Sequence, residues 1–174
     1  MDGRTEPDDL TRATVTVAWV IILNKPFYPL YVWWLVGSGV EASLGTLIAT
    51  PFFLAIALLA PRGPLAARLG LPLAGAIDTI IATKFIGFST GTLLFLAPCM
   101  MLAGLSFHRG EAWWQRGAAA LVFLVFIAGY DRLGAALHAW STAELDTLFS
   151  LNAFAVASLM AFIAIRYAGI RRDA

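Results

Sequence analysis

The chain has 174 residues, of which 60% are hydrophobic and 13% are charged. Soluble domains are typically about 45–50% apolar and about 25% charged, so a water-soluble fold could not bury this much apolar surface. At about 20 apolar residues per membrane-spanning helix, the length allows about six helices with short loops. We therefore predict an all-α fold, a polytopic transmembrane helical bundle.

The two ends of the chain are polar, and the rest is predicted to lie in the membrane. Residues 1–13 form an acidic N-terminus without the basic start and cleavage site of a removable signal peptide, so the first helix is expected to act as the targeting signal. Residues 14–168 are predicted to form a six-helix transmembrane domain, followed by a short basic tail at residues 169–174. The single cysteine, Cys99, excludes an internal disulfide and a multi-thiolate metal site.

The apolar sequence divides into six predicted membrane spans. In chain order they are Thr14–Val36, Leu44–Ala60, Leu71–Ile86, Gly91–Phe107, Gly117–Tyr130 and Leu148–Ala168. The third and fourth are separated only by glycine, serine and threonine at residues 87–91, which predicts a tight helical hairpin. The fifth is short, and we expect Trp113 and Trp114 before it and Leu133–Leu137 after it to extend it through the membrane interfaces.

The arginines set the predicted orientation, because loops on the cytoplasmic side of a membrane protein are enriched in Arg and Lys. With a cytoplasmic N-terminus, nine of the ten arginines lie inside and only Arg132 lies outside. The inner nine are Arg4, Arg12, Arg62, Arg68, Arg109, Arg116, Arg166, Arg171 and Arg172. A five-span topology would place the C-terminal arginines outside. We therefore predict a multi-pass protein of the bacterial inner (cytoplasmic) membrane with both ends in the cytoplasm.

The two lysines lie within the apolar runs, unlike the arginines. Lys25 belongs to an Asn24-Lys25-Pro26 interruption near the middle of the first span, and Pro29 follows one turn later. A lysine at the bilayer centre costs about 2.5–3.5 kcal/mol on insertion scales. Proline frees backbone carbonyls that neighbouring groups must then satisfy. The sequence predicts a kinked, polar site at this point.

Asp78 lies near the middle of the third span and is the natural partner for Lys25. Asp78 and Lys84 are six residues apart, about 240° around a helix, so they do not face each other. Matched depth instead predicts an interhelical pair of Lys25 and Asp78. Such a pair is either a ligand, ion or proton site that switches between paired and unpaired states, or a structural ion pair that fixes helix register.

Three further polar residues complete the set of candidate ligand or ion-pair positions. Asn24 adjoins Lys25, and Lys84 lies toward the outer end of the third span. Asn152, in the last span, is a weaker candidate, because a single amide commonly hydrogen-bonds a neighbouring helix.

The sequence contains no recognisable catalytic centre. His108 and His138 could in principle hold a haem, but the predicted topology places them on opposite sides of roughly 30 Å of hydrocarbon. Paired carboxylates, a nucleophile elbow, a phosphate-binding glycine loop and a metal-ligand cluster are all lacking from the sequence. We therefore predict no enzyme activity, cofactor, metal or nucleic-acid partner.

One segment resembles a known family. It contains Thr83-Lys84-Phe85-Ile86-Gly87-Phe88-Ser89-Thr90-Gly91, then Leu94-Phe95-Leu96, Pro98-Cys99, Leu102-Ala103 and Phe107. This resembles the pattern T-K-x-x-G-x-x-S/T-G followed by F-L-x-P-C-x-x-L-A. That pattern occurs in the six-helix membrane anchors of bacterial class III adenylate and guanylate cyclases and of some sensor kinases. Arg109 and Glu111 match the family's basic-acidic cytoplasmic loop; outside residues 83–111 only the topology is similar.

The resemblance implies a sensory or regulatory membrane module whose hairpin, Lys84 to Gly91, faces the cell exterior. Lys84 and Cys99 carry over as family positions without a catalytic role. The sequence contains no segment like the family's cyclase or kinase output domain. We therefore expect either that the module works alone, by dimerising or by docking on a partner, or that the chain is a relic or fragment of a longer signalling architecture.

Three functions remain open at this point: a membrane sensor in signalling, a small oligomeric transporter or channel that uses Lys25 and Asp78, and an accessory subunit of a larger membrane complex. The expected partners are the lipid bilayer, a second copy or another membrane protein, and an unidentified small ligand.

Overall fold

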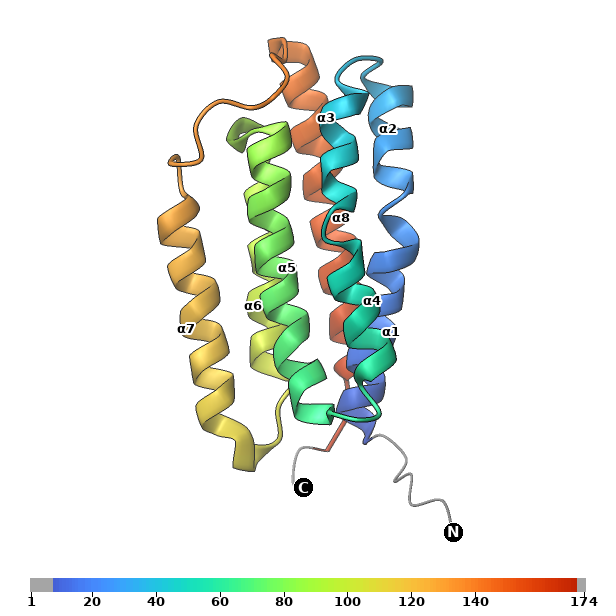
Figure 1. Ribbon diagram of the computed structural model, residues 1–174, viewed down its shortest axis with the longest axis vertical. Coiled ribbons are helices and arrows are strands. Elements are labelled where there is room, and N and C mark those ends of the chain that lie inside the picture. The colour runs from blue at the N-terminus through green and yellow to red at the C-terminus, as the bar shows by residue number, and fades with distance from the viewer. Residues whose placement is uncertain (1–7, 172–174) are drawn as a thin grey trace.

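The computed structural model describes residues 8–171, and every regular element in this range is helical. The helices lie side by side along the long axis and alternate in direction (Figure 1). The start of α1 and the end of α8 therefore lie at the same end of the bundle, which we call the terminal end; the opposite end is the far end. The predicted all-α bundle is confirmed for the described residues.

The elements run in the following order. They are α1 (Asp9–Asn24), α2 (Phe27–Leu35), α3 (Val40–Leu44), η1 (Gly45–Leu47), α4 (Thr50–Leu59), α5 (Pro64–Ile86), η2 (Phe88–Thr90), η3 (Thr92–Phe95), α6 (Leu96–Leu105), η4 (Arg109–Glu111), α7 (Ala112–Gly129) and α8 (Thr142–Tyr167), where η marks short 3-10 helices.

Within residues 8–171, four helical segments are long and apolar enough to cross a membrane. They are Val40–Leu59, Pro64–Ile86, Arg109–Gly129 and Thr142–Tyr167. The pair α1 and α2 makes a fifth if it counts as one span bent by 42°, and Thr92–Leu105 is a shorter apolar helix.

The helices begin earlier than the apolar runs, because polar caps set their starts. α1 begins at Asp9 rather than Thr14, since the Asp8 carboxylate accepts a hydrogen bond from the Thr11 backbone N–H at 3.0 Å. Leu10 is fully buried in the core. The end of the segment expected to be a polar tail is therefore part of the bundle, while residues 1–7 lie outside the described range.

Residues at the helix start, and not the apolar run, also determine where α5 and α8 begin. Pro64 begins α5, at a position where its missing N–H costs nothing. α8 begins at Thr142 because Ser141 and Glu144 form a reciprocal capping box, with the Glu144 carboxylate accepting from the Ser141 N–H at 2.7 Å. Apolar runs thus locate the buried length of each helix, and caps locate its ends.

The chain after α7 differs from the prediction. α7 contains Trp113 and Trp114 as expected, but it ends at Gly129, so Leu133–Leu137 do not extend it. The physical reason is that this loop caps α5: the Leu137 N–H donates to the Phe85 carbonyl at 3.1 Å, satisfying a carbonyl that the helix end leaves free.

The tight turn expected at residues 87–91 is present between α5 and η3. Gly87 and Gly91 both have positive φ angles, 111° and 78°, which favour glycine. The Thr90 hydroxyl donates to the Gly87 carbonyl at 2.7 Å and closes the turn.

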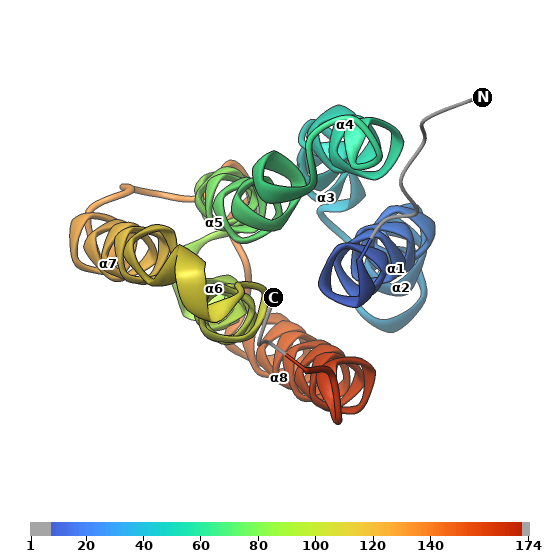
Figure 2. The ribbon, with the colours of Figure 1, turned by 90° about the horizontal axis from the view of Figure 1, so that it is seen from below.

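The core lies where α1, α4, α5, α6 and α8 meet. Its buried side chains include Leu10, Val17, Phe53, Leu71, Leu102 and Ile163. Viewed from the terminal end, α7 stands at one edge of the bundle, against α5 and α6 (Figure 2). α5 contacts α1, α4, α6 and α7, so it is the central helix of the fold.

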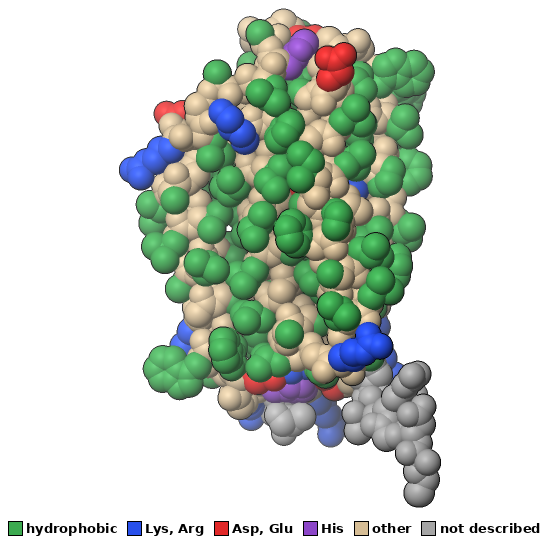
Figure 3. All heavy atoms as spheres, in the orientation of Figure 1, with side chains coloured by type: hydrophobic (Ala, Val, Ile, Leu, Met, Phe, Trp, Pro, Cys, Tyr) green, Lys and Arg blue, Asp and Glu red, His purple; other side chains and the backbone are tan. Residues whose placement is uncertain are grey.

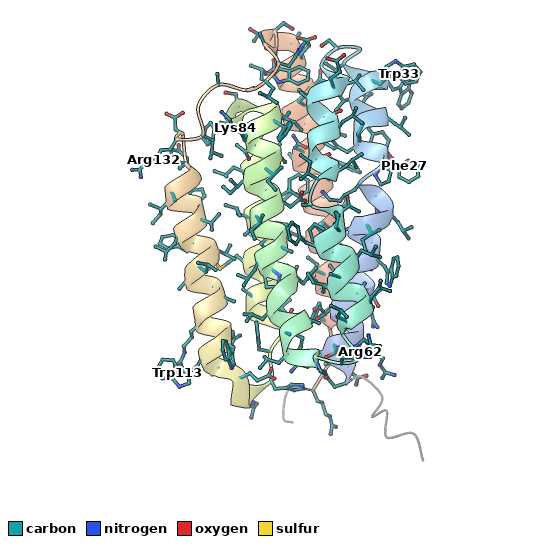
Figure 4. All side chains as sticks on the ribbon, in the orientation of Figure 1. Phe27, Trp33, Arg62, Lys84, Trp113 and Arg132 are labelled. Carbon is teal, nitrogen blue, oxygen red and sulfur yellow. The ribbon has the colours of Figure 1, made fainter. Side chains whose placement is uncertain are left out.

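The outer surface is suited to hydrocarbon. Hydrophobic side chains cover the middle of the visible face, whereas charged side chains gather at its two ends (Figure 3). Phe27, Trp33 and Trp113 all point away from the bundle (Figure 4). Trp113 is 81% exposed, and the Arg116 guanidinium lies 5.4 Å from its ring centre, as expected for an interfacial anchor.

Candidate functional site

The two charged side chains expected to meet in the middle of the bundle are in contact. The Lys25 ammonium lies 2.7 Å and 2.9 Å from the two carboxylate oxygens of Asp78. It also donates to the backbone carbonyl of Thr46, and the Phe53 ring centre lies 5.5 Å away. All three ammonium donors therefore have an acceptor, and an aromatic face adds a cation–π contact.

Two helix interruptions create this site. Lys25 and Pro26 separate α1 from α2, where the chain bends by 42°. Facing this bend, the chain between α3 and α4 tightens into the 3-10 helix Gly45–Leu47, and Pro51 follows without an N–H for the helix ladder. The Lys25 side chain crosses from the first interruption to the second, and Asp78 of α5 faces both.

Because both side chains are largely buried, each charge is stabilised mainly by the other. The side chain of Lys25 is 9% exposed and that of Asp78 is 20% exposed. A single charge at this depth is costly, whereas the pair is neutral and hydrogen-bonded. The predicted pairing is confirmed, and whether the pair binds a ligand or fixes the helices stays a prediction.

A line of buried hydroxyl groups continues from this pair toward the far end. The Thr83 hydroxyl donates to the Thr79 carbonyl at 2.7 Å, and the Thr92 hydroxyl donates to the Thr83 hydroxyl at 2.9 Å. Asn152 of α8 is fully buried, and its amide donates to the Thr90 carbonyl at 2.8 Å. Asn152 thus makes the interhelical hydrogen bond expected of it.

Asn24 and Lys84, the other two candidates, lie away from the pair. Asn24 is exposed on α1 and donates to the Val20 carbonyl at 2.8 Å. Lys84 reaches the loop between α7 and α8, where it donates to the Leu133 carbonyl at 3.0 Å (Figure 4). Helix phase turns Asn24 outward, and a long side chain near a helix end extends toward the interface.

A second polar cluster, which the sequence did not reveal, lies at the terminal end around Arg68 of α5. Arg68 is only 3% exposed and donates to Asp8 at 2.7 Å, to the Thr11 hydroxyl at 2.8 Å and to Glu111. His108 approaches the same Asp8 carboxylate at 3.4 Å. We call these residues, Asp8, Thr11, Arg68, His108 and Glu111, the Arg68 cluster; it joins α1, α5 and η4.

Tyr167 connects this end of the bundle to α8. Its hydroxyl lies 2.9 Å from the Thr14 hydroxyl of α1 and 3.0 Å from the Ser106 hydroxyl that follows α6. Beyond α8, Gly169 has a φ of 75°, and Ile170 packs back against the core. The end of α8 is therefore held in the bundle by both polar and apolar contacts.

The electrostatics of Asp8 follow from its partners. Burial disfavours the charged carboxylate, but two hydrogen bonds from Thr11 and the nearby Arg68 and His108 outweigh it, so the pKa of Asp8 lies below its usual range.

The histidines and the cysteine occupy separate places. His108 belongs to the Arg68 cluster, and His138 packs against Trp140 in the loop at the far end, with ring centres 4.4 Å apart. Cys99 is buried beside Gly75 of α5, where an added Cβ would come within 2.6 Å of the sulfur. Within residues 8–171, no three His, Cys, Asp or Glu side chains are grouped to hold a metal ion.

No protein family model, curated protein or solved structure matches this chain. The similarity over residues 83–111 therefore rests on those residues alone, and the role that it implies is a proposal.

Removing one partner of the central pair should lower the free energy of unfolding more than removing both partners. Lys25→Met or Asp78→Leu leaves a buried charge unpaired and should destabilise the protein by about 3–5 kcal/mol. The double variant should lose clearly less than the sum of the two single losses. Unfolding in mixed micelles measures this cycle. Lys84→Met is the control, because the Lys84 ammonium lies outside the pair and donates to the backbone carbonyls of Leu133 and Ala135. Strictly additive losses would contradict the coupling.

Asp8 should stabilise the fold in a pH-dependent way. Its pKa is lowered on folding from the ordinary value of 3.8, so its contribution is complete above that pH and disappears as the pH falls through the lower, folded value. The melting temperature of the wild type should therefore exceed that of Asp8→Asn at pH 6, and the difference should vanish in strong acid. Asp9→Asn is the control, because Asp9 is exposed and pairs at the surface with Arg12.

Proposed function

We propose that this protein is an integral membrane sensor or regulatory module without intrinsic catalysis, similar to the membrane domains of bacterial cyclases. It crosses the inner membrane six times, with α1 and α2 together forming one span and Thr92–Leu105 another. Both chain ends face the cytoplasm. The distribution of arginines supports this orientation: Arg62 lies at the terminal end and Arg132 at the far end (Figure 4).

One observation carries the proposal: α1 and α5, which run parallel, are joined by charged groups at two depths. In the middle of the bundle Lys25 pairs with Asp78, and at the terminal end Asp8 pairs with Arg68. A displacement of α1 against α5 at the first contact therefore acts on the second. The Arg68 cluster also includes Glu111, so the displacement reaches the chain before α7.

The central pair supplies the two states that a sensor needs. A ligand, an ion or a proton that neutralises or displaces one partner leaves the other buried and unsatisfied, which favours a different packing of α1 and α5. The bend at Lys25 and Pro26 is the point at which the first span can change its angle. At the terminal end, the Arg68 cluster and the Tyr167 contacts carry this change to the cytoplasmic surface.

Neutralising Asp78 should therefore loosen the terminal end. We expect Asp78→Asn to accelerate amide hydrogen exchange several-fold at residues 108–112 and 167–171 in lipid nanodiscs, because α1 no longer holds α5 in register. Lys84→Gln is the matched control, since it removes a charge from the same helix outside the pair. Exchange that stays at wild-type rates at both terminal segments, while α1 and α5 themselves change, would contradict the proposal.

A small oligomeric transporter or channel is the second candidate, and the facing helix interruptions favour it. Transporters build substrate and ion sites from interrupted helices near the bilayer midplane, where unwound carbonyls and a buried charge meet. Here the Thr46 carbonyl and Asp78 occupy such a place around the Lys25 ammonium.

The transporter hypothesis predicts flux that depends on the central pair. Proteoliposomes carrying an internal pH-sensitive dye and an imposed proton or sodium gradient should show flux with the wild type and with Lys84→Gln. Lys25→Ala and Asp78→Asn should abolish it, because each removes one of the two charges along the path. Wild-type liposomes that stay as tight as empty ones, or flux that persists in both variants, would eliminate this function.

A further inference from the structure

Asn24 places an amide side chain on the outer surface of the bundle, next to the central ion pair. It is the last residue of α1 and is exposed, whereas its neighbour Lys25 is buried and pairs with Asp78. Successive residues of a helix differ by about 1.5 Å along the axis, so Asn24 lies at the depth of the pair. In the proposed topology this depth is near the centre of roughly 30 Å of hydrocarbon. The amide is therefore out of reach of water and lipid headgroups.

The helix that carries Asn24 satisfies only part of its amide. One amide N–H donates to the Val20 carbonyl at 2.8 Å, and within residues 8–171 the side chain makes no other hydrogen bond. An asparagine side chain has two N–H donors and a carbonyl oxygen, so one donor and the oxygen are left without a partner. In hydrocarbon, an amide without its hydrogen bonds is costly. Polar side chains within membrane spans accordingly tend to face other protein groups rather than lipid.

Exposed hydroxyl side chains elsewhere on the bundle do not have this problem. The Thr16 hydroxyl of α1 donates to the Arg12 carbonyl at 2.8 Å, and the Ser150 hydroxyl of α8 donates to the Asp146 carbonyl at 2.9 Å. A hydroxyl can be satisfied in this way by a carbonyl of its own helix. An amide oxygen needs a donor instead, and the N–H groups inside a helix are already bonded to the preceding turn. The missing donor for Asn24 must therefore come from another helix.

The chemistry around Asn24 defines the partner. Leu23 beside it and Phe27 after it are large, apolar and exposed, and Phe27 points away from the bundle (Figure 4). The partner is therefore a helix within the membrane. The free N–H and the free oxygen of one amide match those of a second amide. Across a twofold axis, each Asn24 oxygen can accept from the N–H of the other copy, which gives two equivalent hydrogen bonds. A second copy of this chain supplies that match without any further group.

We propose that the protein forms a symmetric dimer in which the Asn24 amides of two copies hydrogen-bond each other between their first spans. The proposal rests on the topology proposed above, in which α1 and α2 form one span, but not on a sensor or transporter role. The bends at Lys25 and Pro26 of the two copies lie on either side of the dimer axis, because these residues directly follow Asn24. The dimer contact is thus adjacent to the residue that holds the central ion pair.

Energy transfer between donor-labelled and acceptor-labelled copies of the full-length protein in liposomes tests the dimer. Raising the ratio of lipid to protein separates the copies and gives the dissociation constant. Asn24→Leu should raise this constant by about tenfold or more, because two interhelical hydrogen bonds are lost. Asn24→Gln retains an amide and should associate more tightly than Asn24→Leu. Ser150→Ala is the matched control and should dissociate like the wild type, since the Ser150 hydroxyl is satisfied within its own helix.

Oxidative cross-linking gives a second measurement that leaves Asn24 in place. In a Cys99→Ala background, Val20→Cys should cross-link two copies, because Val20 lies one turn before Asn24 on α1. Ser150→Cys, on α8, should not cross-link.

Two results would overturn the proposal. One is a wild type that stays monomeric at low ratios of lipid to protein, and the other is an equal dissociation constant for the wild type and Asn24→Leu. Either result leaves the sensor proposal standing, because the hydrogen-exchange test of that proposal follows motion within a single chain.

Discussion

The pairing of Lys25 with Asp78 is the interaction around which the middle of this bundle is arranged. In hydrocarbon a charged group must find its counter-charge inside the protein. Lys25 does so by reaching across two interrupted helices to Asp78 of α5 and the Thr46 carbonyl. Three features therefore act together to bring Lys25 to its partners. They are the helix interruptions, the bend of the first span and the position of α3 against α5.

The Arg68 cluster at the terminal end also pairs a buried cation with carboxylates, but with a different set of partners. There a single buried guanidinium serves two carboxylates from different elements, Asp8 and Glu111. Both solutions use α5 as the common partner of α1. α5 is therefore the helix against which α1 is held, and Tyr167 connects α8 to the same arrangement through Thr14.

The features that could be predicted from the sequence are those that follow from the physical properties of single residues, such as charge in lipid or the backbone freedom of glycine. The Lys25–Asp78 contact followed from depth alone, because two opposite charges in lipid must meet. The turn at residues 87–91 followed from its glycines. By contrast, an arginine beside an apolar run has the same local sequence whether it is solvated or enclosed, so nothing marked Arg68 as buried. Asn24 and Asn152 are alike as residues, and only the helix phase, set by caps outside the apolar runs, decides which one faces inward.

The sparse packing of α7 has a consequence for how the protein is assembled. α7 packs against α5 and α6 at one edge of the bundle, and a groove of about 260 Å³ opens between α6 and α7, lined by apolar side chains such as Leu94, Met100 and Phe126. Its separation would leave both charged clusters intact except at Glu111. We therefore expect that α7 can join the bundle after the two charged clusters have formed, with Glu111 adding its contact to Arg68 when it does.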